Sequence, residues 1–203
     1  GLTGPEHGPS QYFTTTRPEA ETALIPVTWH ETGVGLSGQL RDFSYTVQLV
    51  NGLDSTGFSS RNWIAPGQQG RFEQVNAEAL AIVGRLDYTP VTGLTVGASA
   101  YQGDTAPNRP KPDMEGVEAT VTVMEGHLRL ERGPWTLRAL YLHGELDNAD
   151  AVYQANRTLS NNLGVSGTPV GSEAEALGVE AGFDLLSLAA TDQRLDLFVR
   201  YDD

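Results

Sequence analysis

Eight charged side chains stand at alternating positions in short segments that are otherwise largely apolar. They are Arg85, Asp87, Glu118, Arg138, Glu180, Asp184, Asp196 and Arg200. Rows of charges of both signs on opposite walls of a pore would set a transverse field across it and favour small polar solutes. On an exposed sheet face the same side chains would only be solvated. We interpret these eight as candidate pore-lining residues.

Two histidine–glutamate pairs are the other candidates for chemistry. His127 follows Glu125 by two positions, and Glu145 follows His143 by two positions. Residues two apart share one face of a strand, and such a pair could bind a metal. The same pairs are common on barrel walls without any ligand, so we expect no metal and no cofactor. The sequence also contains neither a Gly-x-Ser-x-Gly nucleophile elbow nor a Gly-Lys-Ser/Thr phosphate loop, and we do not expect an enzyme.

The elements that position these residues are β-strands, because apolar and polar residues alternate along the chain. The segments 117–123 and 177–185 are clear examples. A period of two predicts a strand with one apolar face and one polar face. Eight such strands are predicted, over residues 32–41, 43–51, 77–88, 94–103, 116–130, 135–145, 175–186 and 194–201.

The connections between these strands are alternately short and long. A Greek-key sandwich has no reason to keep that rhythm, whereas an up-and-down membrane barrel has tight turns at one rim and long loops at the other. Tyr88, Trp135 and Tyr201 near strand ends would suit an interfacial aromatic girdle. We therefore predict an all-β fold, a transmembrane antiparallel up-and-down β-barrel whose apolar face meets lipid and whose polar face lines a lumen.

The alternation also predicts which side chains face outward. The apolar residues expected on the outer belt include Val117, Val121, Leu137, Tyr141, Val179 and Phe183. The alternation reverses in the middle of the fifth strand, where apolar residues change from odd to even positions. One extra residue would restore the facing, so we expect a β-bulge near Met124 and Glu125.

Composition limits the classes of partner and domain. The chain of 203 residues has a formal net charge of -13, which argues against nucleic acid as a partner. It has no cysteine, so disulfides and thiolate metal sites are impossible. No apolar run is long enough for a transmembrane helix, but the alternating strands of a barrel need none. We expect one β-barrel domain over residues 1–203, with residues 1–31 forming a loop region before the first clear strand.

Several segments resemble the phosphate-selective porin O/P family. They are Arg17-Pro18, Ile25-Pro26-Val27-Thr28-Trp29-His30-Glu31-Thr32-Gly33-Val34-Gly35, Val50-Asn51-Gly52-Leu53, Gly84-Arg85-Leu86-Asp87-Tyr88-Thr89-Pro90 and Phe198-Val199-Arg200-Tyr201. The resemblance implies a sixteen-stranded barrel in the bacterial outer membrane, commonly a homotrimer, that conducts small hydrophilic solutes or ions. This chain would then be an interior portion that supplies about eight of the strands. Phosphate-selective members use a cluster of lysines at the constriction, whereas Lys111 is the sole lysine here.

Three hypotheses for function follow. The first is a passive outer-membrane porin, and its main rival is a soluble or surface-attached all-β module that binds a ligand among the long loops. A self-contained eight-stranded membrane barrel is the third, but its interior would have to be filled by side chains. Small residues at the expected inward positions suit a wider, water-filled lumen; they are Gly35, Ser37, Gly97, Ser99, Gly178 and Gly182.

Overall fold

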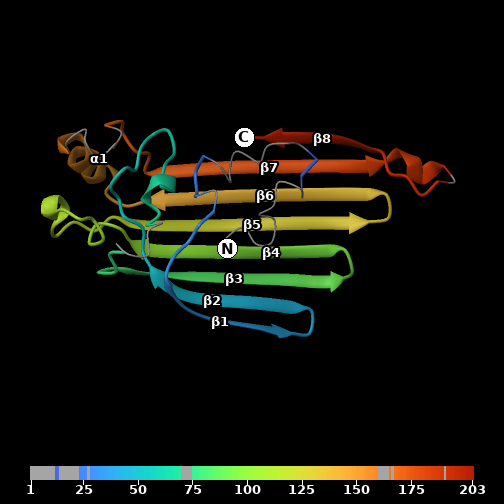
Figure 1. The fold of residues 1–203 in the computed structure, drawn as a ribbon, viewed down its shortest axis with the longest axis horizontal. Helices are drawn as coiled ribbons and strands as arrows, with labels where there is room; N and C mark the ends of the chain where they lie inside the picture. Colours follow the sequence, from blue (N-terminus) through green and yellow to red (C-terminus); the bar gives the residue numbers. More distant parts are fainter. Residues whose placement is uncertain are drawn as a thin grey trace.

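The computed structural model describes residues 12–13, 23–26, 28–69, 75–159, 165, 167–189 and 191–203, and it is an all-β structure (Figure 1). Eight strands form one sheet in which each strand pairs with the next in the sequence, always antiparallel. The strands are β1 (Gly33–Leu40), β2 (Phe43–Asn51), β3 (Leu80–Val91), β4 (Leu94–Asp104), β5 (Thr120–Arg132), β6 (Trp135–Leu146), β7 (Glu173–Asp184) and β8 (Asp196–Asp202). The predicted number of strands and their up-and-down order are confirmed.

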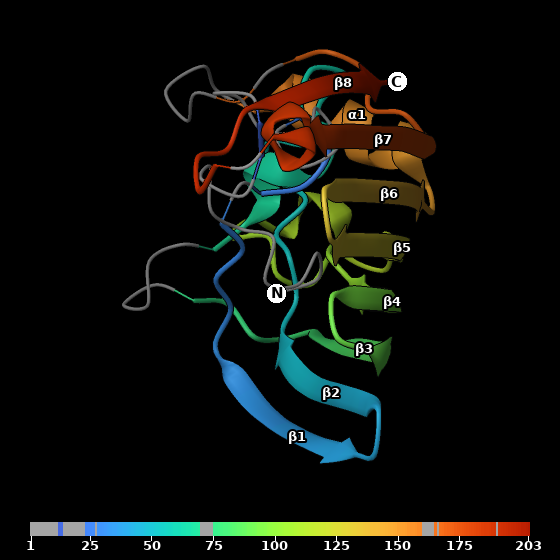
Figure 2. The same cartoon turned by 90° about the vertical axis from the view of Figure 1, so that its right-hand side faces the viewer.

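The sheet is curved but not closed. Viewed along the strands, it forms an open trough with the connection from β2 to β3 on its concave side (Figure 2). Within the described residues, β1 pairs only with β2 and β8 pairs only with β7. Closure into a barrel is therefore not a feature of this structure.

The convex face is apolar across all eight strands. The strand registers place Val47, Gly84, Ala100 and Met124 in one row across β2 to β5, and this row faces outward. Large apolar side chains on this face are exposed, including Leu36, Val47, Leu86, Tyr141 and Val199. Four of the side chains expected on the outer belt, Leu137, Tyr141, Val179 and Phe183, lie on this face.

A hydrophobic core lies at one end of the concave face, beneath the long connections. We call residues 52–69, 105–119, 147–159 and 167–172 the loop cap. It contains the short helices η3 (Ala65–Gly67) and η5 (Pro112–Met114) and the α-helix α1 (Ala149–Thr158). Buried loop-cap residues such as Phe58 and Ile64 belong to the same cluster as Val123 and Leu142 of the sheet. The loop cap thus packs as a second layer on part of the sheet.

This core corrects two expectations about the apolar belt. Val121 was expected outside, but it lies on the concave face with no solvent exposure, and Val117 lies before β5 and packs against the same core. The prediction of a β-bulge near Met124 and Glu125 is also wrong. The strand β5 pairs without interruption with β4 over Thr120–Leu130 and with β6 over Val121–Arg132. The reversal of polarity reflects what covers each half of the strand, not a break in the alternation.

The connection between the strands predicted at 135–145 and 175–186 contains a helix that the strand pattern did not reveal. Within α1, the residues Ala149, Val152, Ala155 and Asn156 are buried, a spacing that places them on one helical face. Asp150 in the first turn and the arginine in the last turn are ordinary helix signals. No helix among the described residues is long and apolar enough to cross a membrane.

Candidate functional site

Seven of the eight candidate pore-lining residues lie on the concave face. They are Arg85, Asp87, Arg138, Glu180, Asp184, Asp196 and Arg200, as the strand registers show. Glu118 is the exception, because β5 begins at Thr120 and Glu118 lies exposed in the segment before it. Its backbone carbonyl accepts a hydrogen bond of 2.7 Å from Asn148 Nδ2.

A network of charged side chains spans β3, β4 and β5 on this face. Arg85 donates to both carboxylate oxygens of Asp87, from Nε and from Nη2, at 2.7 Å each. Asp87 Oδ1 lies 2.8 Å from His127 Nε2, and His127 Nδ1 lies 2.8 Å from Glu125 Oε1. Ser99 Oγ donates to the other oxygen of Glu125 at 2.8 Å. We call these five residues the β3–β5 network.

A glycine makes room for the central contact of this network. Gly97 of β4 pairs with Asp87 on one side and with His127 on the other, so these two side chains must meet above it. A Cβ at Gly97 would lie 2.4 Å from both Asp87 Oδ1 and His127 Nε2. The small inward residue therefore permits contact between side chains two strands apart.

The β3–β5 network has the chemistry of a charged wall. Ser99 donates to Glu125, and the imidazole nitrogens of His127 are engaged by Glu125 and Asp87, so the geometry differs from that of a serine–histidine nucleophile pair. Among the described residues, no group of three or more His, Asp or Glu side chains could hold a metal ion. Both charge signs are fixed within a few ångströms of each other, which creates a strong local electric field at the concave surface.

A second network spans β5 to β7 nearer the short turns. Arg138 donates to Glu180 Oε1 at 3.0 Å and to Glu131 Oε1 at 3.2 Å. The same Glu131 oxygen accepts a bond of 2.9 Å from Arg129 Nη2. Glu180 is buried, with 3% of its surface exposed. Arg138, Glu180, Glu131 and Arg129 form what we call the β5–β7 network.

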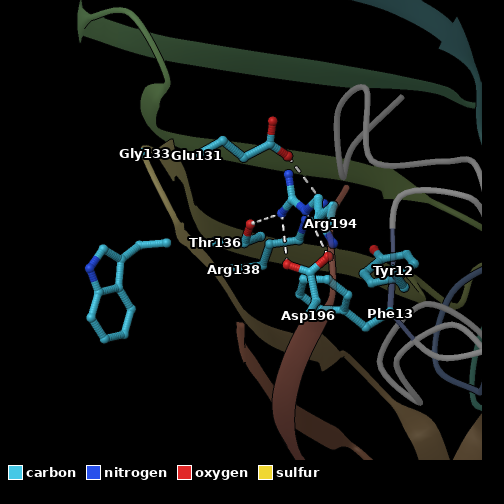
Figure 3. Close-up of a pocket in the computed structure, with 9 residues that line it drawn as sticks. Tyr12, Phe13, Glu131, Gly133, Thr136, Arg138, Arg194 and Asp196 are labelled. Carbon is cyan, nitrogen blue, oxygen red and sulfur yellow. Dashed lines mark hydrogen bonds and ion pairs between the residues drawn. The ribbon is translucent and has the colours of Figure 1, made fainter. Parts of the chain in front are cut away.

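A cavity of about 440 Å³ opens beside this network (Figure 3). Arg194 is one of its lining residues and donates to both oxygens of Asp196, at 2.7 and 2.9 Å, and to Thr136 Oγ1 at 3.3 Å. The cavity is lined by Tyr12, Phe13, Glu131, Gly133, Trp135, Thr136, Arg138, Arg194 and Asp196. It is a mixed aromatic and charged pocket on the concave face.

The remaining two predicted residues, Asp184 and Arg200, form hydrogen bonds at the connection from β7 to β8 and along β8. Asp184 Oδ1 accepts from the backbone N–H groups of Leu186 and Leu195, at 3.1 and 3.0 Å, and so shapes the connection from β7 to β8. Arg200 Nε donates to Asp202 at 2.6 Å on β8. The structure thus brings Arg138 and Glu180 together in one network and Arg85 and Asp87 in another.

The loop cap is held by buried polar side chains as well as by apolar packing. Arg109 donates to both carboxylate oxygens of Asp113, at 2.9 and 2.7 Å, and to Asn156 Oδ1 at 2.8 Å. Asn156 Nδ2 in turn donates to the carbonyls of Ser55 and Phe58, at 3.2 and 3.3 Å. These hydrogen bonds join the β2–β3, β4–β5 and β6–β7 connections into one layer over the concave face.

Sequence reasoning missed several residues of these sites. Arg129 and Glu131 sit at inward parity on β5, so the period of two could have identified them; Ser99 was predicted to face inward, but not to join a charged network. Tyr12 and Phe13 lie in the predicted loop region and carry no alternation that points to the concave wall. The pair His143 and Glu145 lies on the convex face at the loop end, where His143 contacts Glu145 at 3.2 Å and Glu175 at 3.1 Å.

Comparison with known proteins leaves the family open. No protein-family model matches the chain. A protein of Aquifex aeolicus (strain VF5), described as an uncharacterized protein, is 34% identical over 103 residues. The similar region spans 50% of this chain but 23% of the length of that protein. The two sequences therefore share about half of the present chain and less than a quarter of the relative.

Proposed function

We propose that this chain forms part of the wall of an outer-membrane porin through which small hydrophilic solutes or ions diffuse passively. The observation that carries the proposal is the separation of chemistry between the two faces of one sheet. The convex face presents exposed apolar side chains from every strand, while the charged networks of the strands lie on the concave face.

The convex face has the composition expected for contact with lipid. Its large apolar side chains remain exposed, with 66% exposure at Leu36 and 69% at Val199. A soluble monomer rarely exposes a contiguous apolar patch of more than a few hundred Å². Two aromatic pairs lie on this face toward the short turns, Phe43 with Tyr88 and Trp135 with Phe183, where a membrane interface would be.

The concave face suits a wet lumen narrowed at one end. Arg85 and Arg138 are each paired with acidic partners, so these networks carry fixed charges of both signs. Such a wall would not require the solute to carry one particular charge. The loop cap covers the loop end of this face and would reduce the cross-section there. Passage would depend on solute size and on the transverse field between the networks.

The open edges favour a wall wider than eight strands. Lipid cannot satisfy the unpaired N–H and C=O groups of a strand edge, so β1 and β8 need further partners in a membrane. Inward glycines such as Gly35 and Gly97 would leave an eight-stranded interior underfilled. We propose a sixteen-stranded barrel of the phosphate-selective porin O/P type, assembled as a homotrimer, to which this sheet contributes half of the wall.

Planar-bilayer recording of the full-length protein tests the porin function. We expect steady, stepwise currents proportional to salt concentration, with ion preference shifted toward cations by Arg85→Glu or Arg138→Glu. Arg41→Glu, in the β1–β2 turn, makes the same change of charge outside both networks and should shift the preference least. A water-soluble, well-folded protein without channel activity would favour the all-β ligand-binding module instead.

A further inference from the structure

A short aromatic segment lies against the concave wall at the turn end of β7 and β8. The Phe13 ring stacks on Phe198, with ring centroids 5.2 Å apart and planes 14° from parallel. The backbone N–H of Phe13 donates to Glu180 Oε1 at 3.3 Å. An aromatic ring and an adjacent N–H donor are thus recognised together by two strands.

The wall beneath this ring is shaped to receive it. A Cβ at Gly182 would lie 2.4 Å from the Phe13 ring, so only glycine leaves the space that the ring fills. The Arg138 guanidinium lies 5.9 Å from the Phe13 ring centroid and 5.7 Å from that of Tyr12, within the range of cation–π attraction. We call Arg138, Glu180, Gly182 and Phe198 the aromatic cradle.

One acceptor of the cradle still lacks a donor. Glu180 Oε2 is buried and has no hydrogen-bond partner among the described residues, although Oε1 of the same carboxylate accepts from Arg138 and Phe13. A buried acceptor without a donor costs free energy, and an ionised one costs more. The cavity beside the cradle, about 440 Å³ in volume, leaves room for a small molecule to approach.

We propose that the aromatic cradle is a binding site for small solutes that carry an aromatic ring next to an amino group, and that Phe13 occupies it as an internal ligand. The solute ring would replace that of Phe13 over Gly182 and against Phe198. Its ammonium group would replace the Phe13 N–H and also donate to Glu180 Oε2. As a site for permeating solutes on the lumen wall, the cradle rests on the proposed porin function.

The internal ligand predicts a specific effect of its removal. When a site is occupied most of the time by its own chain, its apparent affinity for an added solute is the intrinsic affinity multiplied by the fraction of time that the site is empty. Phe13→Ala should therefore bind L-phenylalaninamide about tenfold more tightly than the unchanged protein, for a cradle that is empty about a tenth of the time. Gly182→Ala should abolish binding, because its methyl group occupies the place of the ring.

Titration calorimetry of the full-length protein in detergent tests the proposal, with three probes. L-Phenylalaninamide has both groups, 3-phenylpropanamide lacks the amine and L-leucinamide lacks the ring. The Phe13→Ala variant should bind the first at least tenfold more tightly than the other two, and Glu180→Gln should remove the advantage of the amine. Gly126→Ala, on the convex face with open space around its Cβ, is the matched control for Gly182→Ala. Phe198→Leu replaces Gly182→Ala if the latter does not fold.

The outcomes separate this proposal from the porin function. Equal affinity of Phe13→Ala for all three probes, or no binding by a protein that still conducts in bilayers, overturns the cradle alone. Binding that depends on Gly182 and Glu180 in a protein without channel activity supports the cradle and contradicts the porin.

Discussion

The concave face has two halves, one beneath the loop cap (the loop half) and one next to the short turns (the turn half). The same strands build both halves, but the loop half is apolar and the turn half is charged. In β5, Val121 and Val123 lie in the loop half and are fully buried beneath the loop cap. Two residues further along, Glu125 and His127 begin the charged β3–β5 network. The period of two is unbroken across this boundary. Alternation therefore specifies which face a side chain joins, whereas the covering layer decides whether that face is apolar.

The largest effect should come from removing a loop-cap side chain from the apolar half. The Trp63 ring lies on Gly144 of β6, and its Nε1 donates to the Gly171 carbonyl at 2.9 Å. Trp63→Ala should lower the free energy of unfolding by about 3–5 kcal/mol, since it leaves a cavity in a close-packed core. Urea unfolding of the full-length protein in detergent, followed by circular dichroism, measures this.

Trp135→Ala is the matched control on the convex face. Trp135 is 57% exposed and contacts Phe183, with ring centroids 4.6 Å apart. Loss of such an aromatic pair should cost about 1 kcal/mol. Equal losses for the two tryptophans would show that the loop cap is no more tightly packed than the convex surface.

The next largest loss of stability should come from replacing Gly97, the glycine that leaves room for the contact between Asp87 and His127 in the polar half. Gly97→Ala places a methyl group between Asp87 and His127, which lie 2.8 Å apart. We expect a loss of about 2 kcal/mol, the range for a hydrogen bond between charged groups. Gly84→Ala adds the same methyl group on the convex face of the neighbouring strand, where nothing lies within 4 Å. If both variants unfold at the same urea concentration, the contact above Gly97 contributes nothing.

The sequence predicted the strands well because alternation is a local property. The prediction for β2 was correct at both ends, and seven of the eight candidate charges lie on the concave face. The misplaced Val121 and the absent bulge have one cause, since the loop cap that buries the valine is built from distant segments. Phe13 reaches Glu180 across 167 positions, a contact that no local pattern contains.

The smallest effect on the free energy of unfolding should come from the carboxyl group of Glu31, which precedes β1 and accepts a hydrogen bond from Asn51 at the end of β2. Burial raises the pKa of Glu31 to about 7, although its oxygens accept from Trp29 Nε1 and Asn51 Nδ2. The folded protein therefore holds this proton between pH 4.5 and about 7 where the unfolded chain releases it, and stability falls as pH rises through that window. Glu31→Gln should flatten this part of the profile, as measured by urea midpoints from pH 4 to 8. An unchanged profile would remove Glu31 as its cause.

The most direct test of the central claim asks which face of the sheet meets water in the membrane. The chain has no cysteine, so single substitutions at neighbouring positions report on the two faces separately. In isolated outer membranes, Ser37→Cys and Thr46→Cys on the concave face should react with a charged, membrane-impermeant thiol reagent. Leu36→Cys and Val47→Cys on the convex face should react only after the membrane is dissolved and the protein unfolded. Equal reaction at all four positions in the intact membrane, or recovery of the protein in the soluble fraction, would contradict the account.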